Sequence, residues 1–176
     1  MPRHRVEAIA NEFLKRSRAE GRSLTNMQLQ KLPYIAHGWC LALAGDELVG
    51  EVPTAFPYGP VYLSLYDALR RYGSGAVGDF IHENDGTATE SFGLVRGDVV
   101  NANLTDSEVK LVDAVWNAYK QFHAFQLSAM THQDDSPWTV VTKRDGAYAP
   151  IPNDVIKTHF VELAARRRAA AKSSAA

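Results

Sequence analysis

Ser128 and His132 are the residues whose types and spacing come nearest to a reaction centre. They lie four positions apart with Asp134 and Asp135 close behind, so a nucleophile, a base and an orienting carboxylate are all present. Neighbouring residues at one helix end rarely reach the geometry of a triad, however, and no nucleophile-elbow motif occurs. No catalytic residue is therefore predicted, and a small hydrolase using Ser128 and His132 is kept as an alternative.

Metal and cofactor chemistry has still less support in the sequence. His123, His132 and either Asp134 or Asp135 could supply metal ligands, but they lack a spacing such as H-E-x-x-H, and the one cysteine, Cys40, excludes a multi-cysteine zinc cluster. The glycines of 73–78 are not followed by Lys and Ser or Thr, as a phosphate-binding loop would require. We predict neither a metal nor a cofactor.

Aromatic residues beside glycine and proline point to binding. Tyr58-Gly59-Pro60 is expected to lie in a loop between an extended segment and a helix. Loops on a rigid scaffold are favoured binding positions, and aromatic anchors dominate protein interfaces. A shaped aromatic surface is therefore the first functional expectation.

The overall composition limits the possible partners. The chain has 176 residues, 45% of them hydrophobic and 22% charged, with a formal net charge of −1. That balance is typical of one soluble domain with a real core, and it gives no general attraction to nucleic acid. The run of 166–168 is the one clustered basic run, and no recognition-helix pattern with base-reading Arg, Asn or Gln stands out, so a DNA-binding autorepressor is kept only as an alternative. No window resembles a signal peptide or a membrane span of roughly 18 apolar residues, which predicts a cytoplasmic protein.

Hydrophobic spacing and start signals predict the elements that must position these residues. Helices are expected from Val6 to about Arg18, from the capping box at Thr25 to near Gly45, and from Pro60 to Gly73. Pro33 should kink the second of these helices, because it removes a main-chain hydrogen bond. Further helices are expected in the second half, at 105–122, 124–130, from Ser136-Pro137 and from Pro152.

Short apolar runs at 80–82 and 92–95, separated by Asn84-Asp85-Gly86, predict a small β-hairpin. The expected fold class is mainly α, a compact single-domain helical bundle of about six to seven helices with this hairpin. The domain should span residues 1–165, and residues 166–176 should form a flexible tail rich in Arg and Ala.

Two signatures, in this order along the chain, resemble the Panacea domain of SocA-like antitoxins. The first comprises Leu29-Gln30-Lys31-Leu32, Tyr34, Gly38-Trp39, Leu41-Ala42-Leu43, Ala55-Phe56 and Tyr58-Gly59-Pro60-Val61. The second comprises Leu127-Ser128, Thr131-His132 and Ser136-Pro137-Trp138. The resemblance covers roughly Val6 to Thr142, with Pro33 as a departure from the usual helix-forming residue.

This resemblance implies a non-enzymatic antitoxin that binds a cognate protein toxin and neutralises it. In the SocA-like branch it also implies a proteolytic adaptor that delivers the toxin to the ClpXP protease. The residues expected to form the partner-binding pocket, on the positions shared with the family, are Lys31, Tyr34, Tyr58, His132 and Trp138.

Overall fold

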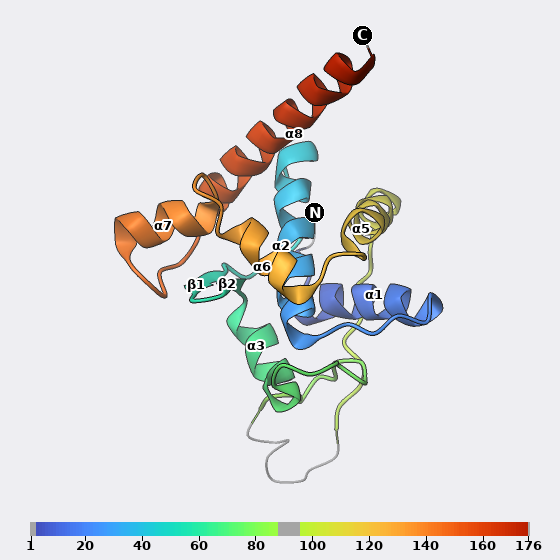
Figure 1. Ribbon diagram of the computed structural model, residues 1–176. Coiled ribbons are helices and arrows are strands. Elements are labelled where there is room, and N and C mark those ends of the chain that lie inside the picture. The colour runs from blue at the N-terminus through green and yellow to red at the C-terminus, as the bar shows by residue number, and fades with distance from the viewer. Residues whose placement is uncertain (1–2, 88–95, 176) are drawn as a thin grey trace.

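The computed structural model describes residues 3–87 and 96–175. Within these ranges the chain forms seven α-helices, one 3₁₀ helix and a two-stranded antiparallel hairpin (Figure 1). In chain order the elements are α1 (Val6–Ala19), α2 (Asn26–Leu43), β1 (Thr54–Phe56), β2 (Gly59–Val61), α3 (Leu63–Leu69), the 3₁₀ helix (Arg70–Tyr72), α5 (Asp106–Tyr119), α6 (Ala124–Thr131), α7 (Pro137–Asp145) and α8 (Asn153–Ala175). The predicted fold class, a mainly α single domain with a small hairpin, is confirmed.

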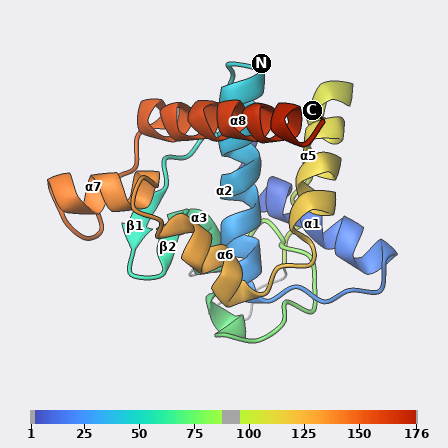
Figure 2. The same cartoon turned by 45° about the horizontal axis from the view of Figure 1, so that its top comes forward.

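Helix α2 runs through the centre of the molecule, and α1, α5, α6 and α8 pack around it (Figures 1 and 2). Every residue from Leu29 to Leu41 is buried, as expected of a helix covered on all sides. Gly38 permits the close crossing of α8, because a Cβ atom at this position would collide with the ring of Phe160. Pro33 lies inside α2, and the kink expected there stays a prediction.

The helix starts predicted from capping motifs are confirmed. Thr25 and Thr105 each accept a hydrogen bond from the backbone N–H three residues on, and Gln28 and Glu108 accept from the N–H groups of the caps. Ser136 caps α7, with Pro137 as its first residue. These starts depend on local chemistry, which is why the sequence alone reveals them.

The third predicted helix begins later than expected. Pro60 was expected to open it but lies in β2, opposite Ala55, and α3 begins at Leu63. Ala55 directs both its N–H and its carbonyl away from β2, to Ala149 and Tyr148, so the missing N–H of Pro60 removes no bond between the two strands. The distant carboxylate of Glu51 accepts the backbone N–H of Ser64 at 3.1 Å and caps α3.

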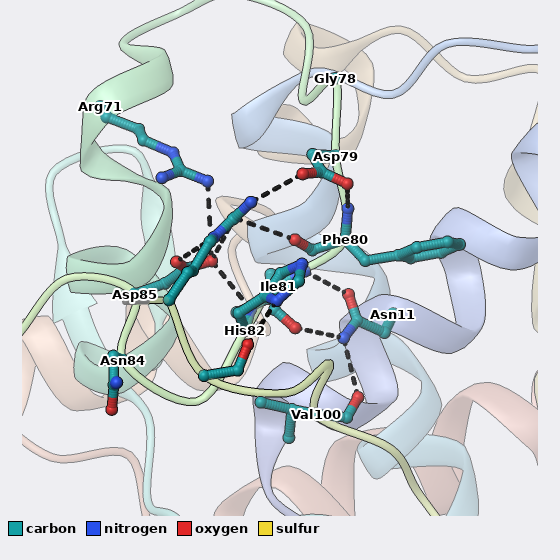
Figure 3. A network of polar contacts seen from close by, with 12 residues as sticks. Asn11, Arg71, Gly78, Asp79, Phe80, Ile81, His82, Asn84, Asp85 and Val100 are labelled. Atoms are coloured by element: carbon teal, nitrogen blue, oxygen red, sulfur yellow. Dashed lines mark hydrogen bonds and ion pairs between the residues drawn. The ribbon is translucent and has the colours of Figure 1, made fainter. Parts of the chain in front are cut away.

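The hairpin that the structure describes lies earlier in the chain than the one predicted from the sequence. It is formed by β1 and β2, whereas at the predicted site His82 forms a single bridge with Val99, and 92–95 lies outside the described residues. The buried side chain of Asn11 instead fastens the segment around Ile81 (Figure 3). Its oxygen accepts the N–H of Ile81 at 2.8 Å, and its NH₂ donates to the carbonyls of Ile81 and Val100 at 2.9 and 2.8 Å. Asn11 on α1 thus binds both backbone segments that meet at this bridge.

The same segment carries an ion-pair network (Figure 3). Arg96 donates to both carboxylate oxygens of Asp85 at 2.7 and 2.8 Å and to Asp79 at 2.7 Å. Burial raises the pKa of Asp85, but hydrogen bonds from Arg96 and from the backbone of His82 outweigh this effect and hold that pKa below its ordinary value. The network fastens this segment beside the 3₁₀ helix.

Helix α8 continues through the residues predicted as a tail, ending at Ala175. Arg166 pairs with Asp135 at 2.6 Å, and Arg167 donates to the hydroxyl of Tyr119 at 3.0 Å. Two members of the basic run thus contact the body of the protein, and a domain boundary at residue 165 stays a prediction.

Candidate functional site

The turn between β1 and β2 is the feature on which the two sequence signatures converge. Its carbonyl oxygens accept hydrogen bonds from three side chains, which belong to α6, α7 and the segment between them. Trp138 Nε1 donates to Phe56 at 2.7 Å, His132 Nε2 to Pro57 at 2.9 Å, and Ser128 Oγ to Tyr58 at 2.8 Å. Side chains some seventy to eighty positions away thus hold three consecutive carbonyls. We call this arrangement the turn clamp.

Lys31 completes the turn clamp from α2. Its ammonium donates to the carbonyl of Pro60 at 2.9 Å, and its side chain is about 1% exposed. Gly59 has φ of 113°, and a Cβ there would collide with the hydroxyl of Thr131 and crowd the ammonium. Glycine is therefore required at this position for both conformation and space.

His132 lies between two carbonyls. Its Nε2 faces Pro57, and its Nδ1 lies 2.6 Å from the main-chain oxygen of Ser128. The imidazole also packs against Trp138 in a tilted arrangement, with 4.0 Å between ring centroids. A neutral ring carries one N–H and satisfies one carbonyl, whereas the imidazolium donates to both. His132 thus joins the turn to α6 and α7.

The same geometry bears on the hydrolase alternative. The hydroxyl of Ser128 donates to the carbonyl of Tyr58, and His132 contacts the main chain of Ser128 in place of its hydroxyl. The two side chains therefore lack the bond between nucleophile and base that this chemistry uses. Within the described ranges, no cluster of three or more His, Cys, Asp or Glu side chains could hold a metal ion.

Beside the turn clamp lies a pocket with a volume of about 320 Å³, between α2, the turn, α3 and the start of α6. We call it the Lys31 pocket; its walls include Gln30, Lys31, Phe56, Tyr58, Tyr66 and Phe125. Tyr58 is 65% exposed and Phe125 is 76% exposed, so large aromatic surfaces form the rim. Few polar groups within a largely apolar pocket are typical of binding sites.

Among the described residues that line this pocket, Lys31 is the only charged one. Burial lowers the pKa of its ammonium to about 7. In the described part of the chain no carboxylate pairs with it, and the carbonyl of Pro60 is its hydrogen-bond acceptor. An ammonium has three N–H groups, so this environment leaves it under-satisfied.

The five predicted pocket residues separate into different environments. Lys31 and Tyr58 line the Lys31 pocket, while His132 and Trp138 hold the turn from behind. Tyr34 is buried against Phe160 with 6.2 Å between ring centroids, and burial raises the pKa of its hydroxyl far above the ordinary value. Tyr34 does not line the Lys31 pocket.

Two further residues that could carry chemistry, His37 and Cys40, are buried. His37 is fully buried; its Nδ1 accepts from the N–H of Val49 at 3.1 Å, and its Nε2 donates to Asn153 at 2.9 Å. Burial raises the pKa of the Cys40 thiol to about 11, which favours the protonated thiol at neutral pH. Both side chains thus lie within the core of the fold.

Gln30 and Phe125 were missed by reasoning from the sequence. Gln30 directly precedes Lys31 on α2, and Phe125 lies on a short helix whose exposed face has no periodic signal. The place of Gln30 in the first signature was the available sign for this residue. Nothing local marks Phe125 as exposed, because only the neighbouring elements decide its burial.

A second apolar groove lies at the other end of α2, against α5 and α8. Its walls include Trp39, Leu43, Leu111, Ala118 and Arg167, and Leu43 is 65% exposed. The guanidinium of Arg167 lies over the ring of Trp39, 4.8 Å from its centroid. We call this the α5 groove.

The helical fold and the clamped turn belong to a recognised class of protein. The profile described as "Antitoxin SocA-like, Panacea domain" matches residues 29–139, more than half of the chain, and the chain belongs to this family. Membership supports an antitoxin role. The matched range begins with the first signature and ends just after the second, so it encloses the whole turn clamp.

One curated relative is Antitoxin SocA of Caulobacter vibrioides (strain NA1000 / CB15N). It is 27% identical over 143 residues, which cover 80% of this chain and 72% of that protein. No solved structure gives a significant match. No helix in the described ranges is long and apolar enough to cross a membrane.

Proposed function

We propose that this protein is the antitoxin of a toxin–antitoxin pair and neutralises a cognate protein toxin by binding it directly. The binding surface we assign to it consists of the Lys31 pocket and the exposed turn at Tyr58. The observation that carries this assignment is the turn clamp, which fixes an exposed aromatic side chain beside an apolar pocket.

The fixed position of the turn and the exposure of the aromatic side chains support the assignment of this binding surface. An interface anchor contributes most when its position is already fixed, because little conformational entropy is then lost on binding. Tyr58 lies in a turn whose neighbouring carbonyls accept four side-chain donors, and the exposed ring of Phe125 lies across the pocket. Aromatic residues in this setting are typical of interface hot spots.

The proposal includes a second step, in which the protein acts as an adaptor that delivers the bound toxin to the ClpXP protease. The resemblance to the SocA-like branch motivates this step. Direct inhibition requires only the complex with the toxin, whereas the adaptor role also requires that toxin degradation depend on this protein.

Co-expression tests both steps. The gene beside that of this protein is expressed in a host with and without it, and growth, complex formation and toxin half-life are measured in hosts with and without the protease. We expect growth to be rescued, the two proteins to co-purify, and the toxin half-life to lengthen when either this protein or the protease is removed.

The outcomes separate the two steps. Absence of both binding and rescue would contradict the antitoxin proposal. Rescue with an unchanged toxin half-life would contradict the adaptor step and leave direct inhibition.

A further inference from the structure

The Lys31 pocket holds a buried cation that has no counter-ion among the described residues. Lys31 is about 1% exposed, and its ammonium uses one of three N–H groups on the carbonyl of Pro60. Burial of an ammonium disfavours its charged form, consistent with the lowering of its pKa to about 7. A partner that brings an anion to this ammonium would restore its charged form and use its free N–H groups.

The same pocket presents a buried acceptor without a donor. The NH₂ of Asn26 donates to the carbonyls of Leu69 and Gly73, both at 3.0 Å, so its oxygen is left to accept from Gln30 Nε2 at 3.1 Å. This chain of bonds fixes the orientation of the Gln30 amide. Its Oε1 is buried and has no donor among the described residues. A backbone N–H of a bound segment would satisfy it.

The rim of the pocket is suited to apolar neighbours of the anion. Tyr58 lies in the turn and Phe125 at the start of α6, and both rings are largely exposed. Because these aromatic residues belong to separate elements, a chain lying across the pocket can contact both while one of its side chains reaches the floor. Lys31 is the one formally charged residue among the described walls, so nothing there repels an anion.

We propose that the Lys31 pocket binds an acidic side chain, Asp or Glu, from an internal segment of the protein partner, with its apolar neighbours on Tyr58 and Phe125. This rests on the proposed function, because the toxin is the partner that would supply the segment. The carboxylate accepts hydrogen bonds from the Lys31 ammonium, and the main chain beside it donates to Gln30 Oε1.

Capped peptides test the chemistry of the pocket directly. The full chain is titrated with Ac-Gly-Leu-Glu-Leu-Gly-NH₂, with its Gln twin, and with the free acid Gly-Gly-Leu, while NMR signals of the Lys31 side chain and Phe125 ring are followed. We expect the Glu peptide to shift both signals and to bind at least tenfold more tightly than the Gln twin.

Variants assign the effect to the pocket. Lys31→Met should weaken binding of the Glu peptide at least tenfold, whereas Lys157→Met, which removes an exposed lysine of α8, should leave it unchanged. Phe125→Ala should also weaken binding, and because its ring is 76% exposed the fold should be retained. Equal binding of the Glu and Gln peptides, or unchanged binding by Lys31→Met, would overturn the proposal, as would no binding up to 10 mM peptide.

Titration with the free acid distinguishes an internal segment from a chain terminus. Titration with the toxin distinguishes failure of this inference from failure of the proposed function. Binding of Gly-Gly-Leu alone would overturn the internal segment in favour of a chain terminus. A toxin that binds Lys31→Met as tightly as the wild type overturns this inference and leaves the antitoxin function intact. A toxin that fails to bind the wild type contradicts the proposed function itself, whatever the peptides do.

Discussion

At the scale of single residues, the central finding is the environment of Lys31. It lies on the buried central helix, bonds to the carbonyl of Pro60, and has no carboxylate partner among the described residues. A buried, unpaired ammonium costs stability, and a hydrophobic side chain of similar length would avoid this cost. A residue that costs stability in the free protein is expected where a partner later satisfies it.

The pKa of Lys31 gives a prediction with a definite sign. The unfolded chain holds this proton up to about pH 10.4, whereas the folded protein releases it near pH 7. Between these values unfolding takes up a proton, so stability rises with pH by up to about 1.4 kcal/mol per unit. Below pH 7 both states are protonated and the cost of burying the charge is fully present.

We therefore expect Lys31→Met to raise the free energy of unfolding relative to the wild type most at pH 6 and least at pH 9. The variant loses the hydrogen bond to Pro60 at every pH, which costs about 1 kcal/mol. The diagnostic quantity is therefore how the difference in free energy of unfolding between variant and wild type changes with pH. Urea denaturation at pH 6, 7.5 and 9 measures it, with Lys157→Met as the exposed control. Parallel pH profiles for wild type and Lys31→Met would contradict the assignment.

At the scale of elements, the turn between β1 and β2 depends on α6 and α7. A two-stranded hairpin is marginal by itself, and here each strand is three residues long. The turn clamp supplies what the ladder lacks, because the carbonyls of the turn bond to Ser128, His132 and Trp138. Residues shared with the family thus serve the position of Tyr58 as much as any direct contact with a partner.

Trp138→Phe tests the turn clamp by removing one donor while retaining an aromatic ring beside His132. Loss of the bond to Phe56 should lower the free energy of unfolding by about 1–2 kcal/mol and speed cleavage by chymotrypsin after the exposed Tyr58. Trp116→Phe is the matched control, since it removes a bond from an indole to Glu20 far from the turn along the chain. Equal rates of turn cleavage in the two variants would show that the turn does not depend on Trp138.

At the scale of the whole molecule, α2 separates two exposed apolar regions. The Lys31 pocket lies toward its first half and the α5 groove at its C-terminal end. Lys31 and Leu43 are twelve residues apart, or about 18 Å along the helix at the usual rise. A toxin can therefore cover one region and leave the other exposed.

We expect the toxin to cover the region of the Lys31 pocket. Phe125→Ala should weaken the complex at least tenfold, because a large exposed aromatic residue is typical of a hot spot, and Leu43→Ala should leave the affinity unchanged. Calorimetric titration with the purified toxin measures both affinities. A loss confined to Leu43→Ala would place the interface at the α5 groove.

The sequence by itself determined the helices, their caps and the family signatures. Thr25, Thr105 and Ser136 satisfy backbone groups within three residues of themselves, and such local bonds leave a pattern in a single stretch of chain. The mainly α fold class was predictable for the same reason.

Only the tertiary structure decided what the signatures do. The place of Pro60 in β2 depends on the bonds of Ala55 to Ala149, and the start of α3 depends on Glu51. The segment around Ile81 is held by Asn11. The turn at Tyr58 is held by side chains about seventy positions away. Burial of Lys31 and exposure of Phe125 likewise follow from which elements pack beside them. Contacts between distant segments form when the whole chain folds, so no local pattern encodes them.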